Sequence, residues 1–193
     1  GLSSAGTAVF GKTDSATGAA AFFWNSAGGD AIRTEGTIRV GGRTVTRVLE
    51  ITGGADVAEP FAMNKPDEIT PGSVVTIAED GTGTLELSRS AYNTCVAGIV
   101  SGANGINPGL CLSQDGVNDG HGHKVALSGR VYCLADASTG EIKPGDLLTT
   151  SATPGHAMKV RDHTRSQGAI LGKAMSRLAE GEKGHVLVLV TLQ

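Results

Sequence analysis

"ITPGSVVTI" at residues 69–77 returns as "IKPGDLLTT" at residues 142–150, so the chain contains an internal repeat. In each stretch an isoleucine, Ile69 or Ile142, precedes a Pro-Gly pair, in which proline restricts φ and glycine accepts a positive φ. This combination is typical of a turn, and the apolar residues after it predict a buried strand. The residues expected in equivalent strands are Val74, Val75, Leu147 and Leu148.

The repeat extends beyond the first strand. Each copy continues through a glycine-containing turn, "DGTG" or "TPG", into a second short strand, "TLELS" or "AMKV". "GIVSGA" at residues 98–103 matches "AILGKA" at residues 169–174 at a similar offset. Two further strands are predicted at residues 124–136 and 185–193, and the continuous apolar run of the second indicates a central or interchain position. We therefore expect an all-β fold, a compact β-barrel or sandwich built from two related halves.

Composition agrees with β structure and argues against some classes of binding partner. The 193 residues include 29 glycines and 4% aromatic residues, which indicates many turns and few large core side chains. A net charge of -3 gives no electrostatic reason to expect nucleic acid or an anionic membrane as partner. The longest apolar runs are too short to cross a bilayer, so we expect no membrane insertion. Cys95, Cys111 and Cys133 match no zinc or redox spacing, and we expect buried free thiols.

Residues 1–48 form a different kind of sequence, with short alternating pieces separated by glycine and serine. The apolar residues are too few for this segment to bury a core of its own. We predict the end of a fibre stalk, a Gly-rich β segment in which identical chains complete one another's core. The alternative is a flexible low-complexity leader, against which the cluster "FFW" argues. The apolar residues are chiefly Val9, Phe10, Phe22, Phe23, Trp24, Ile32, Ile38 and Val40.

The remaining sequence, residues 49–193, resembles the C-terminal domains of phage tail fibres, spikes and related bacterial surface fibres. The residues that carry the resemblance are "GGADVAEPF" at the domain's start and the segment from "IKPGDLLTTSATPGHAMKV" to "GHVLVLVTLQ". In outline it is also similar to the autoproteolytic intramolecular chaperone domain of some phage appendages. The resemblance implies a homotrimer that ends a fibre, on a virion tail or another extracellular surface, and nucleates assembly of the stalk. It also implies contact with a host receptor or glycan.

The same resemblance raises the alternative of self-cleavage near Gly53–Ala55. Such cleavage needs a nucleophile, a base and a donor for the leaving amide, and Thr52, Asp56 and Glu59 could supply them. However, glycines flank the predicted bond where a side-chain nucleophile is expected. We therefore prefer a structural role, in which Asp56 and Glu59 accept hydrogen bonds at the joint between stalk and barrel. No Gly-x-Ser-x-Gly, phosphate-loop or Cys-His pattern suggests an external substrate.

A second group of candidate residues is the pair His121 and His123 in "NDGHGHK". Residues two apart in an extended segment face the same side, so both imidazoles could bind one metal ion. A threefold axis would bring six such nitrogens together, which predicts a site for a metal ion on the trimer axis. The alternative is a solvated loop without metal, since the surrounding sequence is polar and rich in glycine. No other cofactor is expected.

Overall fold

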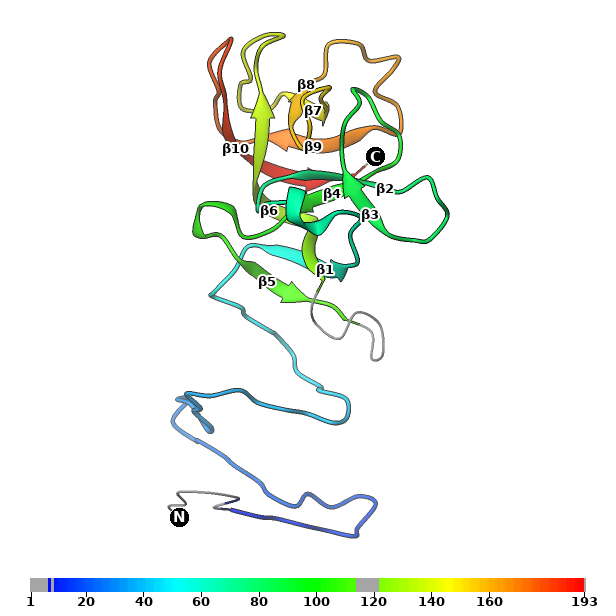
Figure 1. Ribbon diagram of the computed structural model, residues 1–193. Helices are drawn as coiled ribbons and strands as arrows, with labels where there is room; N and C mark the ends of the chain where they lie inside the picture. Colours follow the sequence, from blue (N-terminus) through cyan, green and yellow to red (C-terminus); the bar gives the residue numbers. More distant parts are fainter. Residues whose placement is uncertain (1–6, 8, 114–121, 193) are drawn as a thin grey trace. The chain divides into compact units, whose positions relative to one another are not determined.

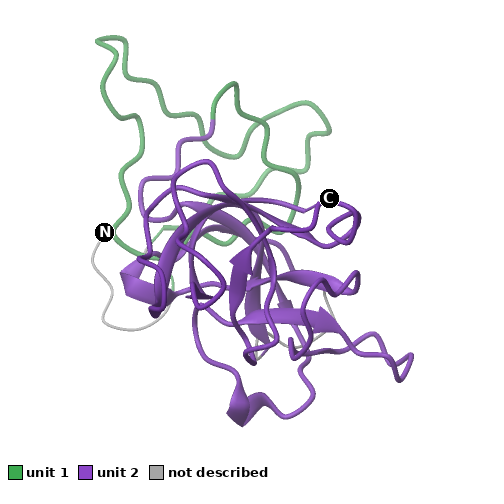
Figure 2. Cartoon of the chain, turned by 90° about the horizontal axis from the view of Figure 1, so that it is seen from above, with its two compact units in different colours: residues 1–48 green, residues 49–193 purple. Residues whose placement is uncertain are grey.

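The computed structural model describes residue 7 and residues 9–113 and 122–192. By its internal contacts the chain divides into two compact units, Gly1–Val48 and Leu49–Gln193, which are coloured separately in Figure 2. Regular structure in the described residues is almost entirely β, with two short 3-10 turns, η1 (Pro66–Glu68) and η2 (Ala103–Gly105), and no α-helix. No helix in this part of the chain is long and apolar enough to span a membrane.

The second half of the larger unit is a closed five-stranded β-barrel. Strand β10 pairs with β9, β9 with β7, β7 with β8, β8 with β6, and β6 returns to β10. The prediction of an all-β fold with a barrel is therefore confirmed. The strands of the ring are β6 (His123–Asp136), β7 (Leu147–Thr150), β8 (Ala157–Lys159), β9 (Ile170–Ala174) and β10 (Lys183–Thr191).

The first half extends from the same long strand. From β6 the sheet continues through β4 and β2 to β3, and the isolated parallel bridge between Leu85 and Met63 leads back towards β1, which pairs with β6 again. β5 lies parallel to β1 (Figure 1). Strand β6 thus serves both halves, because its early residues pair with β1 and β4 and its later residues with β10. The strands of this half are β1 (Asp56–Phe61), β2 (Val74–Ile77), β3 (Leu85–Leu87), β4 (Val96–Val100) and β5 (Pro108–Cys111).

The internal duplication is visible in the turns and in the strand register. Gly72 and Gly145 precede β2 and β7 with nearly identical φ values of 91° and 92°. Each then donates its N–H to the last residue of the third strand, Gly72 to Val100 and Gly145 to Ala174. The four residues predicted to lie in strands do so, in β2 and β7.

One part of the predicted alignment is wrong. Gly98 corresponds to Gly172, so "GIV" at residues 98–100 matches "GKA" at residues 172–174 and not "AIL". The strand register shows this, because Val75 pairs with Gly98 and Leu148 with Gly172, each next to a β-bulge. A side chain at either glycine would collide with the neighbouring strand, which explains the shared residue.

Two buried clusters fill the two halves. The larger contains the interior of the closed ring, including Leu148, Leu171, Val186 and Val188. The smaller contains Ile69, Val75, Leu85, Val100 and Val125. The cysteines are free, but only Cys133 is buried, while Cys95 is half-buried and Cys111 exposed. The expectation of three buried thiols is therefore wrong for Cys111, which lies on β5 next to exposed Leu110.

The smaller unit has neither strand nor helix in its described part, residue 7 and residues 9–48, and every one of those residues is exposed. The predicted β stalk depends on pairing between chains, which a single chain does not contain, so it stays a prediction. The eight apolar residues singled out above are each 58% to 82% exposed.

Candidate functional site

The strongest candidate is the entrance of the chain into the barrel at Asp56, the first residue of β1. Its side chain is only 3% exposed. The hydroxyl of Ser101 donates a hydrogen bond of 2.6 Å to Oδ2, while Oδ1 is buried without a hydrogen-bond partner among the described residues. Burial raises the pKa of this carboxyl, and the bond from Ser101 offsets the rise only in part. Asp56 is therefore a buried acid that resists ionisation.

The backbone before Asp56 is held on two sides. The N–H of Ala55 donates to the carbonyl of Asn107 (3.2 Å), and the carbonyl of Ala55 accepts from the N–H of Arg130 (2.9 Å). A Cβ on Gly54 would collide with the backbone of Pro108 and Gly109. The glycine is thus needed for close approach of two backbones.

The remaining predicted catalytic residues do not gather around Asp56. Asp56 is buried beside Ser101, whereas Glu59 is half-buried and lines an open groove with Phe61 and Cys111. Thr52 is exposed and lies in an irregular segment before β1. Among the described residues no hydrogen bond joins Thr52, Asp56 and Glu59. A base, an acid and a nucleophile are not assembled in this arrangement of the single chain.

Only one residue of the histidine pair lies within the described part of the chain. His123 begins β6 opposite Phe61, whereas His121 lies outside the described residues. In the part of the chain that is described, no group of three or more His, Cys, Asp or Glu side chains could hold a metal ion. The predicted metal site across a threefold axis depends on other chains and stays a prediction.

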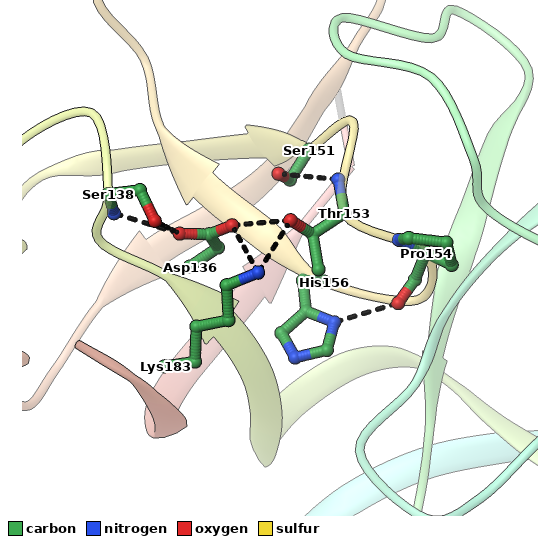
Figure 3. Close-up of polar contacts among 7 residues, drawn as sticks. All are labelled: Asp136, Ser138, Ser151, Thr153, Pro154, His156 and Lys183. Carbon is green, nitrogen blue, oxygen red and sulfur yellow. Dashed lines mark hydrogen bonds and ion pairs between the residues drawn. The ribbon is translucent and has the colours of Figure 1, made fainter. Parts of the chain in front are cut away.

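A second polar cluster surrounds Asp136 at the end of β6 (Figure 3). The N–H of Ser138 donates to Oδ1 at 2.8 Å, and the Ser138 hydroxyl donates to the same oxygen. Oδ2 accepts from the hydroxyl of Thr153 and forms an ion pair of 3.2 Å with Nζ of Lys183. The cluster joins the end of β6, the turn between β7 and β8, and the start of β10. Sequence reasoning missed it, although Asp-x-Ser is a recognisable Asx-turn pattern.

The charges of this cluster argue against catalysis. Burial alone would raise the pKa of Asp136, but the hydrogen bonds from Ser138, Thr153 and Lys183 outweigh it and hold the pKa well below its ordinary value. A carboxylate with so low a pKa is a poor general base. His156 points its Nδ1 at the carbonyl of Pro154 (2.7 Å) and not at the carboxylate. The cluster is a structural connection between strands.

Comparison with protein-family models finds no match to this sequence, and comparison with curated proteins finds no significant relative.

Proposed function

We propose that this chain is the C-terminal assembly module of a homotrimeric fibre, in which residues 1–48 end the stalk and residues 49–193 form the terminal barrel. The observation that supports it best is the exposure of the stalk's apolar side chains. Phe10, Phe22 and Trp24 are each about four-fifths exposed at 82%, 81% and 79%. Exposed apolar groups on this scale mark a surface that another molecule covers.

Identical copies of the chain are the partner that fits this segment. Its described backbone forms neither strand nor helix in the single chain, and backbone N–H and C=O groups require hydrogen-bond partners when apolar neighbours are buried. Parallel copies that wind around one axis offer strand pairing and apolar contacts at the same heights along the fibre. The threefold number and the contact with a host receptor or glycan rest on the resemblance of residues 49–193 to fibre domains.

The test is the mass of the full chain in solution. Mass photometry or sedimentation of residues 1–193 should give three times 19.5 kDa. Trp24→Ser combined with Phe22→Ser should weaken the assembly, because it removes two of the large apolar side chains available for burial. The control is Thr164→Ser, a conservative change in an exposed loop of the barrel. A monomeric wild type would refute the proposal.

A second candidate function is self-cleavage near Gly53–Ala55, and the buried Asp56 is the observation that favours it. A carboxyl with a raised pKa, within two residues of the bond, is suited to donate a proton to a leaving amide. Against it stands the different setting of the two carboxylates, since Asp56 is buried beside Ser101 and Glu59 lines an open groove. Assembly of three chains would have to bring the missing groups from a neighbour.

Purified full-length chain would decide between the two. Cleavage predicts a new N-terminus near Gly53–Ala55 in intact-mass measurements over time, and its loss in Asp56→Asn. Ser101→Ala serves as the matched variant, since it alters the surroundings of the same carboxyl without removing it. A chain that keeps its full mass over the time course would exclude this activity under the conditions used.

A further inference from the structure

The outer face of β9, β10 and β6 is more apolar than the outer face of an antiparallel barrel in water is expected to be. In such a barrel, inward apolar residues alternate with outward polar ones. Along β10 the inward residues Val186, Val188 and Val190 are buried, but the outward positions include Leu187 and Leu189. Leu189 is 40% exposed. The middle of the strand therefore carries apolar side chains on both faces.

The internal duplication shows what covers the equivalent face in the first half of the larger unit. There, Val74, Ile99 and Ala126 form a row across β2, β4 and β6, as their pairing shows. All three are fully buried in the same cluster as the interior of the second half. The outer row of the first repeat is thus covered by the second repeat.

The equivalent row of the second repeat has no such cover. By the same register Leu147 pairs with Lys173, and Lys173 with Leu189. The described residues leave Lys173 and Leu189 exposed and Leu147 half-buried. Met175, which is 42% exposed, adjoins this row, because its N–H donates to the carbonyl of Leu187.

We propose that a second copy of this chain covers this row, so that Leu147, Leu187, Leu189 and Met175 form the contact between neighbouring barrels. The inference rests on the proposed function, because the stalk would tether the barrels through Val48 and Leu49 at high local concentration. It adds the face through which the barrels themselves associate.

The charges on the face indicate the type of symmetry. Lys173 and Arg130 are both partners of Leu189 across the strands, so the row carries two positive charges. A twofold contact of this face with itself would place these positive charges against each other, which is unfavourable. The contact therefore joins this face to a different surface of the next copy. Head-to-tail contacts form a closed ring when the rotation between copies is a third of a full turn, as in the proposed trimer.

The test uses the full chain with a photoreactive benzoylphenylalanine at position 189. The matched control places the same group at Thr164, an exposed position in the loop before β9. Irradiation should give cross-linked chains at position 189 and not at 164. An oligomer of confirmed mass that does not cross-link at 189 would overturn this inference and leave the proposed function standing. A monomeric chain would overturn both.

A second variant measures how much Leu189 contributes to the stability of the oligomer. Leu189→Arg should raise the concentration at which the oligomer dissociates by roughly tenfold or more, because it buries an unpaired charge. Far-UV circular dichroism should stay unchanged, since the side chain points out of the barrel. Thr164→Arg should leave the dissociation concentration at the wild-type value. An unchanged dissociation concentration in Leu189→Arg would contradict the proposed contact.

Discussion

At the scale of single residues, two glycines and one buried carboxyl group lead to predictions about stability. Gly72 and Gly145 occupy equivalent turns with the same positive φ, yet their surroundings differ. A Cβ at Gly145 would meet nothing within 4 Å, whereas a Cβ at Gly72 would lie 3.1 Å from Nε2 of His185. The two positions therefore separate backbone strain from crowding.

Gly145→Ala should lower the free energy of unfolding by about 1 to 2 kcal/mol, the cost of a left-handed backbone for a residue with Cβ. Gly72→Ala should cost more, and His185→Ala in that background should remove the excess. Denaturant unfolding of the four chains checks this. Equal costs for the two single glycine variants would show that the His185 ring moves aside freely.

Asp56 makes a prediction about pH. Because its folded pKa is raised, the folded chain holds this proton more tightly than the unfolded chain, so stability is lost as pH rises from the ordinary value of 3.8 through the folded pKa. Asp56→Asn keeps an acceptor for Ser101 and removes the charge. The variant should be at least as stable as wild type at pH 7, with the smallest difference near pH 4. A variant that is less stable by the same amount at both pH values would indicate an unrecognised partner of the carboxylate.

At the scale of secondary-structure elements, Asp136 at the end of β6 is linked by hydrogen bonds and an ion pair to the start of β10 and to the turn after β7. Asp136→Ala should cost about 2 to 3 kcal/mol, since it leaves charge-assisted hydrogen bonds unmade. Lys183 is 51% exposed, so Lys183→Met should cost at most about 1 kcal/mol. Hydrogen exchange should show the loss of protection first in β10. Uniform loss across the barrel would mean that the cluster does not act locally.

The same cluster should contribute to acid unfolding. The pKa of Asp136 is depressed, so its stabilising contribution is complete above the ordinary value of 3.8 and disappears as pH falls below it. Wild type and Asp136→Ala should therefore differ most at neutral pH and converge in acid. Thermal unfolding between pH 7 and pH 2 measures the convergence. A constant difference throughout would assign the effect to packing instead.

At the scale of the whole molecule, Trp24 reports on the stalk because it is the single tryptophan of the chain. It is 79% exposed when the chain is alone. In the proposed trimer its ring is buried, so the emission should shift to shorter wavelength and acrylamide quenching should weaken. Dilution should reverse both changes while the barrel keeps its circular dichroism. A solvent-like emission from a confirmed oligomer would place Trp24 outside the interface.

Local sequence patterns predicted most of the barrel's strands and missed some of its boundaries. The Ile-Pro-Gly turns predicted β2 and β7 because proline and glycine restrict the backbone within a few residues. β1 was not predicted as a strand, and without it the different surroundings of Asp56 and Glu59 could not be seen. Its strand character comes from pairing with β6, more than sixty residues later.

By itself the sequence determined an all-β domain with a duplicated turn and strand, and a preceding segment with too few apolar residues to fold alone. These features depend on neighbours along the chain and on composition. Only the tertiary structure decided that β6 serves both halves, that Gly98 corresponds to Gly172, and that the outer row of one repeat is covered while that of the other is open. The physical reason is that strand register and ring closure depend on packing between residues distant in sequence, and a local sequence pattern holds no information on that packing.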